Sequence, residues 1–69
     1  MQFIVNKNVR RILRETEQKQ KEVAERAGMS EMVFSNICRC KRKVYADEVV
    51  PIATSLGVSI EALFVEKPA

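Results

Sequence analysis

The residues of this chain that are best suited to chemistry are cations, and four of them stand within five positions. The run is Arg39-Cys40-Lys41-Arg42-Lys43. A cluster of this kind could bind a polyanion, or it could be a solvated surface that binds nothing, since charged runs are common on protein surfaces. The run therefore indicates polyanion binding only if a neighbouring element gives the cations a target.

Charge is divided unevenly along the chain, whose net charge is +3. Residues 1–43 contain eleven Lys or Arg and five Glu, whereas residues 44–69 contain one Lys and four acidic residues. This asymmetry predicts one basic face that could meet a polyanion and an acidic end that would not. A second basic cluster shares the first predicted helix, where it could face solvent or a phosphate backbone. Its members are Lys7, Arg10, Arg11 and Arg14.

The chemistry of an enzyme is missing from the sequence. There is no His, no glycine-rich phosphate loop and no pair of carboxylates on an apolar pocket, so we expect neither catalysis nor a cofactor. Cys38 and Cys40 cannot complete a zinc site, which needs four ligands. A metal shared between subunits or a redox switch remains an alternative to incidental thiols.

The cellular location can also be predicted from the sequence. On a helix the side chains of Cys38 and Cys40 diverge, so a mutual disulfide would be strained and a reducing compartment fits better. No apolar run approaches the ~18 residues of a membrane span, and residues 1–5 lack the basic start of a signal peptide. We expect a cytoplasmic protein.

Residues 20–43 organise the chain as two short helices, a glycine turn and the basic run. Apolar spacing predicts helices at about 20–27 and 31–39. Gly28 permits the left-handed conformation that ends a helix, and Ser30 can cap the next one. Phe34 and Ile37 face inward, and the outward face of the second helix carries hydrogen-bonding groups and one flexible apolar chain. Those outward residues are Glu31, Met32, Ser35 and Asn36.

Three further helices are expected around this unit. Asn6 is a suitable cap for a first helix ending near Glu15, with Val9, Ile12 and Leu13 buried. Tyr45 or Asp47 starts a fourth helix, and Pro51 near its first turn predicts a late start or a slight kink. Its inward residues are Val49, Ile52, Ala53 and Leu56. After Gly57, with Ser59 as cap, a fifth helix begins at about Ile60 and buries Ile60, Leu63 and Phe64. The expected fold is all-α, a compact five-helix bundle in one domain over residues 1–69, with its core at about 6–65.

Several landmarks share the spacing of a known family. Gln20-x-x-x-Ala24-x-x-x-Gly28-x-Ser30, followed by Ile37, Lys41 and Leu56-Gly57-Val58-Ser59, resembles the Cro and Xre-type phage repressors, which have the lambda repressor-like fold. The resemblance covers roughly residues 6–65. It implies a helix-turn-helix transcriptional regulator, acting as a repressor, that binds double-stranded DNA in the cytoplasm and is associated with the nucleoid when bound.

The resemblance also assigns roles to side chains. The third helix would enter the major groove, where Glu31, Met32, Ser35 and Asn36 match the base-reading positions. Gln20, at the start of the second helix, matches a residue that contacts the DNA backbone and is often also the first recognition side chain. Further backbone contacts are expected from the basic run and from the first helix. These are Arg39, Lys41, Arg42, Lys43, Arg10 and Arg14.

The chain departs from the family pattern at four positions. Glu31 places a carboxylate near phosphates, although at a first helical turn it also favours the helix dipole. Cys40 stands where glycine is usual and predicts strain, and Val44 replaces a usual proline. Lys19 replaces a small hydroxyl residue that would cap the second helix. The loss of that cap should lower local stability by about 1 kcal/mol.

One recognition helix covers few base pairs, so we expect a homodimer on a pseudo-palindromic operator. The fifth helix and its tail, with Leu63, Phe64 and Val65, are the expected dimer surface. An antitoxin-like or adaptor module that keeps the fold but binds protein instead of DNA remains the alternative, because fold alone does not determine function.

Overall fold

The computed structural model describes residues 3–66, so that residues 1–2 and 67–69 of the predicted single domain lie outside the described part. The elements in order are α1 (Ile4–Thr16), α2 (Gln20–Ala27), α3 (Glu31–Cys38), α4 (Ala46–Leu56) and the 3₁₀ helix η1 (Ile60–Phe64). No strand occurs within these residues, which confirms the all-α class. The predicted count of five α-helices is wrong, because the fifth element is a 3₁₀ helix.

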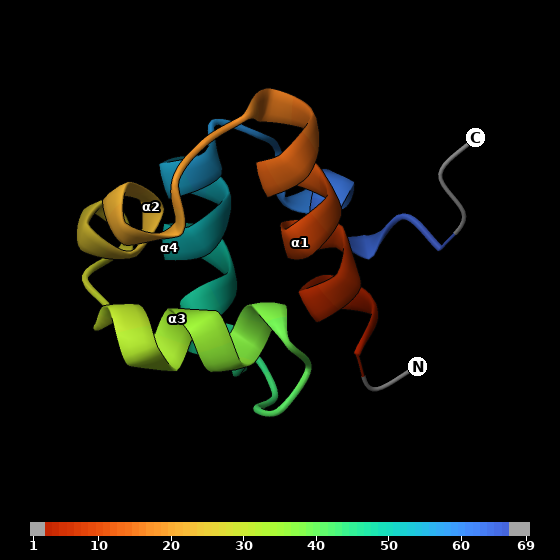
Figure 1. The fold of residues 1–69 in the computed structure, drawn as a ribbon. Helices are drawn as coiled ribbons and strands as arrows, with labels where there is room; N and C mark the ends of the chain where they lie inside the picture. Colours follow the sequence, from red (N-terminus) through yellow and green to blue (C-terminus); the bar gives the residue numbers. More distant parts are fainter. Residues whose placement is uncertain (1–2, 67–69) are drawn as a thin grey trace.

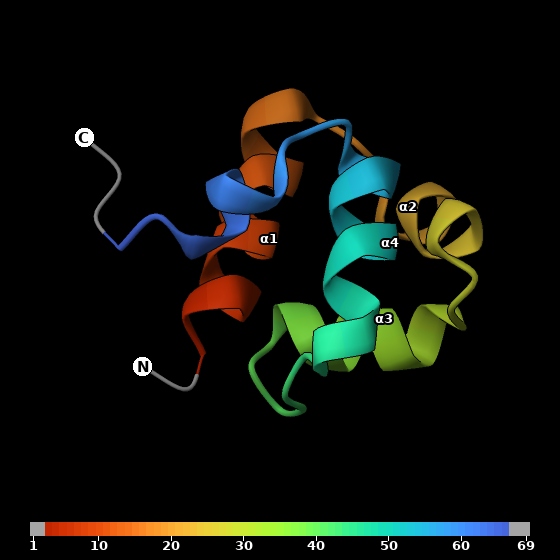
Figure 2. The same cartoon turned by 180° about the vertical axis from the view of Figure 1, so that it is seen from behind.

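The helices pack around one core, with α3 along one end of the molecule (Figure 1 and Figure 2). α3 contacts α1 and α2, whereas α4 contacts α2 and η1. Each large apolar side chain removed from water contributes about 1.5–3 kcal/mol, so this core supplies most of the stability that holds α3 in place. The largest fully buried apolar side chains are Phe34, Ile37, Ile52, Leu63, Val9 and Val23.

α1 begins earlier than predicted, and Asn6 is not its cap. The N-cap is Phe3, and Asn6 is the third helical residue, fully buried. Its Nδ2 donates to the carbonyl oxygens of Ile37 at 2.9 Å and Arg42 at 2.7 Å. A buried amide needs such partners, and the Ile37 carbonyl at the end of α3 accepts it as a second donor beside the Cys40 N–H. Asn6 therefore joins α1 to α3 and the following loop.

The helix-turn-helix unit is confirmed almost to the residue. α2 has the predicted bounds, and α3 ends at Cys38, one residue early. Gly28 has φ +75°, the left-handed value expected of it. Ser30 caps α3 as predicted, since its Oγ accepts from the Val33 N–H at 3.2 Å.

α4 does not start late in response to Pro51. It begins at Ala46 with Tyr45 as N-cap, which places Pro51 in the second turn. There a proline removes the hydrogen bond to the carbonyl four residues earlier. Glu48 supports the first turn instead, because its Oε1 accepts from the Tyr45 N–H at 2.9 Å. Ile52, Ala53 and Leu56 are buried as predicted and Val49 is partly buried against the core.

The C-terminal element buries only Leu63. Ile60 and Phe64 are 43% and 49% exposed, so their predicted burial is wrong. With three residues per turn, residues 63 and 64 point about 120° apart and cannot share a face. Ser59 makes no side-chain cap, also against prediction. The segment is held to α1 instead, where Asn8 Nδ2 donates to the carbonyls of Leu63 at 2.8 Å and Val65 at 2.9 Å.

Candidate nucleic-acid interface

The outward face of α3 forms one side of a shallow depression of about 350 Å³. It brings together the four predicted base-reading residues, the predicted first residue of α2 and the first cation of the basic run. Met32 is 75% exposed although it is a large apolar side chain. The full lining is Gln20, Glu31, Met32, Ser35, Asn36 and Arg39.

Helical spacing explains why these side chains gather. Glu31, Met32, Ser35 and Asn36 stand at i, i+1, i+4 and i+5, and therefore share the face opposite fully buried Phe34. Within residues 3–66, none of the four side chains is hydrogen-bonded to another group of the protein. Their polar groups are therefore available to an external partner, while the buried side of the helix holds its position.

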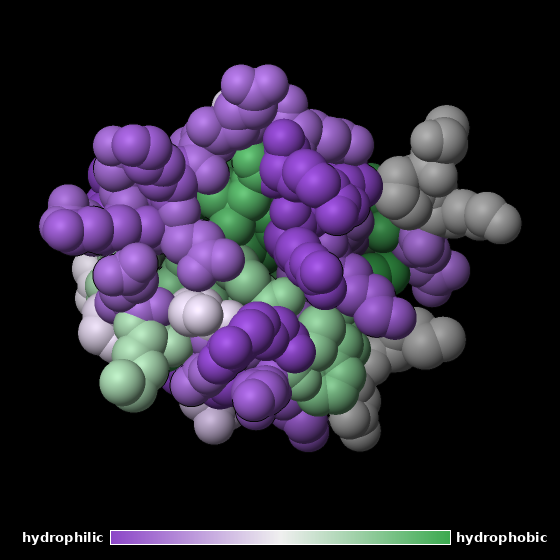
Figure 3. Space-filling model, in the orientation of Figure 1, coloured by the Kyte–Doolittle hydropathy of each residue, from purple (hydrophilic) through white to green (hydrophobic). Residues whose placement is uncertain are grey.

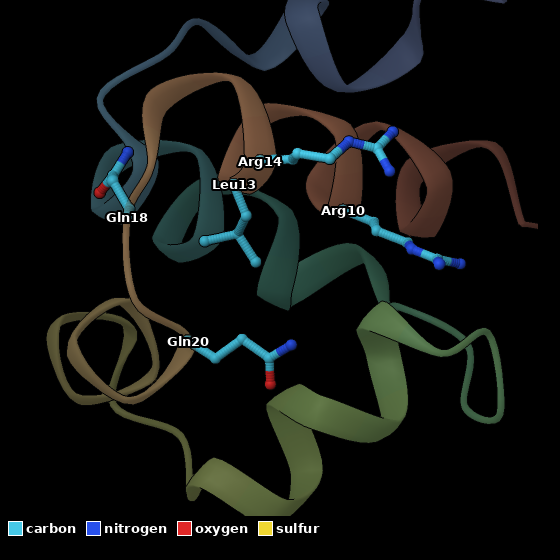
Figure 4. Close-up of a pocket in the computed structure, with 5 residues that line it drawn as sticks. All are labelled: Arg10, Leu13, Arg14, Gln18 and Gln20. Carbon is cyan, nitrogen blue, oxygen red and sulfur yellow. The ribbon is translucent and has the colours of Figure 1, made fainter.

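A second depression, of about 240 Å³, lies between α1 and the start of α2. Figure 4 shows Gln20 projecting from α2 into the space that Arg10 and Arg14 border from α1. Gln20 lines both depressions, so they adjoin at this residue. Leu13 and Gln18 complete the lining, and Figure 3 shows an apolar strip between hydrophilic groups on this side of the molecule.

This second depression suits an anion. Arg10 and Arg14 are exposed, and among the described residues neither takes part in an ion pair. Lys19 provides no side-chain cap to α2, as predicted, so the N–H groups of its first turn lack that partner. Free N–H groups at a helix N-terminus attract phosphate, and the two arginines add to this field.

Gln18 has a different role, which sequence reasoning missed. Its Nε2 donates to the Leu56 carbonyl at 3.1 Å, and its Oε1 accepts from Arg26 at 2.7 Å. Arg26 also donates to the Ser55 carbonyl at 3.1 Å. These bonds cover the C-terminal carbonyls of α4 and fix the linker that leads into α2. Only the polar composition of the linker could have indicated such a role.

The basic run turns sharply after α3. Cys40 has φ +59°, which confirms the strain predicted where glycine is usual and costs about 1–2 kcal/mol. The turn is closed by the Lys41 N–H, which donates to the Asn36 carbonyl at 2.8 Å. Arg39, Lys41 and Lys43 are exposed, so they remain available to an anion beside the α3 face.

Arg42 differs from the other cations of the run. Its Nη1 and Nη2 donate to both carboxylate oxygens of Glu48, at 2.9 and 2.8 Å, and its guanidinium lies 4.9 Å from the centre of the Tyr45 ring. The hydrogen bonds from Arg42 hold the pKa of the Glu48 carboxyl below its usual value. Arg42 is thus already paired, which its place in the run did not indicate.

The two cysteines are both free. Cys38 is 2% exposed, and its burial raises the pKa of the thiol to about 11, despite the opposing field of Arg10. It therefore stays protonated near neutral pH. Within residues 3–66 no group of three or more His, Cys, Asp or Glu could hold a metal ion. No helix of that part is long and apolar enough to cross a membrane.

Comparison with known proteins agrees with this geometry. The family model of the Cro/C1-type HTH DNA-binding domain matches residues 8–68, which include both depressions and the basic run. Comparisons with curated proteins and with solved structures gave no significant match.

Proposed function

Because the chain belongs to the Cro/C1-type family of helix-turn-helix DNA-binding domains, we propose that it is a transcriptional repressor that reads a specific DNA sequence with α3. The observation that carries the proposal is the depression in which Gln20, the outward side chains of α3 and Arg39 meet. The protein is no enzyme and uses no cofactor in this role. It acts in the cytoplasm, on the nucleoid.

The side chains on α3 match base edges in the major groove. Asn36 pairs with an adenine through two hydrogen bonds, and Glu31 accepts from the amino group of a cytosine. Met32, whose apolar side chain is 75% exposed, lies against a thymine methyl group. Ser35 donates to a base or a phosphate. A good pair of this kind contributes about 1–3 kcal/mol of discrimination against the wrong base.

Phosphate contacts on both sides orient α3 in the groove. On one side Gln20 and the first turn of α2 approach the backbone together with Arg10 and Arg14. On the other side stand the exposed cations of the basic run. These contacts carry no sequence information but fix the register of the protein on the duplex. The cations of the run that serve this role are Arg39, Lys41 and Lys43.

The protein acts as a homodimer on a pseudo-palindromic operator, with half-sites about 34 Å apart. Leu63 is left out of the proposed dimer surface, because its side chain is fully buried within one chain. Ile60, Phe64 and Val65 are between 42% and 49% exposed, and they form the contact instead. Pairing two copies there would remove these apolar groups from water.

The test is selection of binding sites from a random pool of double-stranded DNA at two salt concentrations, with sedimentation of the free and bound protein. We expect an inverted-repeat site, a dimer, and affinity that falls steeply with salt. Asn36→Ala should cost about 1–3 kcal/mol and relax preference at one base position. Thr54→Ala, an exposed change on α4, is the matched control and should leave binding unchanged.

Salt dependence separates the two kinds of contact. Lys43→Met should weaken binding to all sequences alike and reduce the salt slope by about 1. If the selection enriched no particular DNA sequence at low salt, the proposed function would be refuted and a protein-binding adaptor would be favoured. A monomer both free and on DNA would refute the dimer.

A further inference from the structure

The loop between α3 and α4 is held at one residue, Arg42, from both sides. Asn6 of α1 binds its backbone carbonyl at 2.7 Å. Glu48 of α4 binds its guanidinium through two hydrogen bonds of 2.9 and 2.8 Å, and the Tyr45 ring lies beneath it. Arg42 Nη1 also donates to the Lys43 carbonyl at 3.1 Å. We call Asn6, Arg42 and Glu48 the loop support.

Each bond in the loop support is constrained by its surroundings. The fully buried Asn6 amide donates to two carbonyls, which can only accept, so its orientation is determined. The Glu48 carboxylate receives Arg42 through both oxygens and also the Tyr45 N–H, at 2.9 Å. The side chains of Arg42 and Glu48 are only 28% and 20% exposed. A planar guanidinium with two parallel bonds has one geometry, so the pair specifies where the loop lies.

We infer that Arg42 does not contact phosphate but positions the loop, together with Asn6 and Glu48, so that its exposed neighbours Lys41 and Lys43 meet the DNA backbone. The inference rests on the proposed function and deepens it. Three of the five N–H groups of Arg42 already donate, to Glu48 and to the Lys43 carbonyl, so a bidentate phosphate contact through Nη1 and Nη2 would break the pair with Glu48. Lys41 and Lys43 have no such partner among the described residues, and they flank the fixed residue on both sides.

The sign of one substitution distinguishes positioning from simple charge. Glu48→Gln removes a negative charge near DNA, so bulk electrostatics alone predicts tighter binding. In the loop support, a carboxamide oxygen at the position of Oε1 can still accept from Arg42 Nη1 and the Tyr45 N–H, but the NH₂ group that replaces Oε2 cannot accept from Arg42 Nη2, so the bidentate pair is lost. We expect affinity for the selected operator to fall roughly three- to tenfold, the loss of about one net hydrogen bond. Asp47→Asn, its exposed neighbour in the same turn, is the matched control and should bind as tightly as the wild type or more so.

A second variant tests Arg42 directly. Lysine also binds phosphate as a point charge, but it cannot make the bidentate pair with Glu48. Arg42→Lys should therefore lose affinity like Glu48→Gln, with an unchanged salt slope, and the double variant should bind no worse than the weaker single variant. Any of three results would overturn the inference. These are wild-type affinity in Glu48→Gln, equal losses of affinity in Glu48→Gln and Asp47→Asn, and wild-type affinity in Arg42→Lys.

Amide hydrogen exchange of the free protein keeps this test separate from that of the proposed function. In Glu48→Gln the Lys41 amide, which closes the loop turn, should exchange several-fold faster, whereas the Phe34 amide inside α3 should not change. Equal acceleration of both amides would indicate general destabilisation and count against positioning. If the wild type failed to bind DNA, the proposed function would fall, while this exchange pattern would still decide whether Glu48 holds the loop.

Discussion

Replacing Asn6 by aspartate changes donors into acceptors at a fully buried site with almost no change in shape. In the wild type the Asn6 Nδ2 donates to the carbonyls of Ile37 and Arg42, whereas Oδ1 has no hydrogen-bond partner among the described residues. An ionised carboxylate at this position would put an oxygen in place of Nδ2, facing two carbonyl oxygens. It would be a buried charge with neither a cation nor an N–H to receive it.

The size of the effect follows from these contacts. A protonated carboxyl keeps one donor, so the variant loses one of the two hydrogen bonds, which costs about 1–2 kcal/mol. Holding the proton at pH 7 on a group that ionises near pH 4 when unfolded adds about 1.4 kcal/mol per pH unit. We expect destabilisation of at least about 4 kcal/mol, against a total near 3–10 kcal/mol for 69 residues.

The sign of the pH dependence is a further test of Asn6→Asp. Burial raises the pKa of the introduced carboxyl in the folded state, so between the unfolded and folded pKa values the folded protein binds one proton more. Its stability relative to wild type should therefore rise as pH falls, by about 1.4 kcal/mol per unit, and level off below the unfolded pKa near 4.

Asn8→Asp is the matched control on the same helix. Asn8 also donates to two carbonyls and is 3% exposed, but its Oδ1 accepts from Arg11 at 3.2 Å. A carboxylate there keeps a cation beside it, so we expect about half the loss and a weaker pH dependence. Urea unfolding followed by circular dichroism between about pH 4 and pH 7 measures both variants. If Asn6→Asp were within about 1 kcal/mol of wild type at pH 7, or changed with pH in step with Asn8→Asp, the reasoning would be refuted.

Three further predictions test other parts of the fold. Cys40→Gly should raise stability by up to about 1 kcal/mol in thermal unfolding, because glycine relieves the left-handed strain although it costs chain entropy; a lower melting temperature would contradict this. The pKa of the buried Cys38 thiol is about 11 in the fold against an ordinary value of 9.0, so stability should fall as pH rises between these values. In urea unfolding at alkaline pH, Cys38→Ala should lack roughly 2–3 kcal/mol of this pH-dependent loss of stability. If stability fell with pH equally in the wild type and the variant, the prediction would be wrong. Leu63→Ala should lower the free energy of unfolding by about 2–5 kcal/mol. Phe64→Ala should change the stability of the monomer by less than about 0.5 kcal/mol but weaken self-association in sedimentation. Equal losses of stability in the two variants would contradict the burial of Leu63 alone.

Local signals predicted the helix-turn-helix unit well. Gly28 ends α2 through its own backbone preference, and Ser30 caps α3 through an oxygen three residues from its partner. Both effects act within one turn, so they can be read without knowing the fold. The outward face of α3 followed from helical period alone, and the structure does bring its side chains together with Gln20. Their roles toward DNA stay predictions.

Long-range partners were beyond such reasoning. From the sequence alone, Asn6 could serve equally well as a helix cap or as a buried hydrogen-bond donor. The carbonyls that decide between these roles are 31 and 36 residues away along the chain. Arg42 looked like its basic neighbours until the fold placed it against Glu48. Phe64 was assigned to the core on α-helical spacing, which does not hold for the 3₁₀ geometry of η1. Ile60 lies on the same side of a 3₁₀ helix as Leu63, but it is the first residue of η1 and is 43% exposed. In each case tertiary contacts or helix type overrode a correct local pattern.

The lack of internal hydrogen bonds at the α3 face, within the described residues, has an evolutionary consequence. Because Met32, Ser35 and Asn36 make no side-chain hydrogen bonds within the fold and Glu31 adds only its effect on the helix dipole, substitutions there can alter which target is recognised at little cost in stability. The helix itself is held by buried contacts on its other side and by Ser30. New specificities can therefore arise by single steps on this face, and a library randomised at these four positions should yield mostly folded proteins.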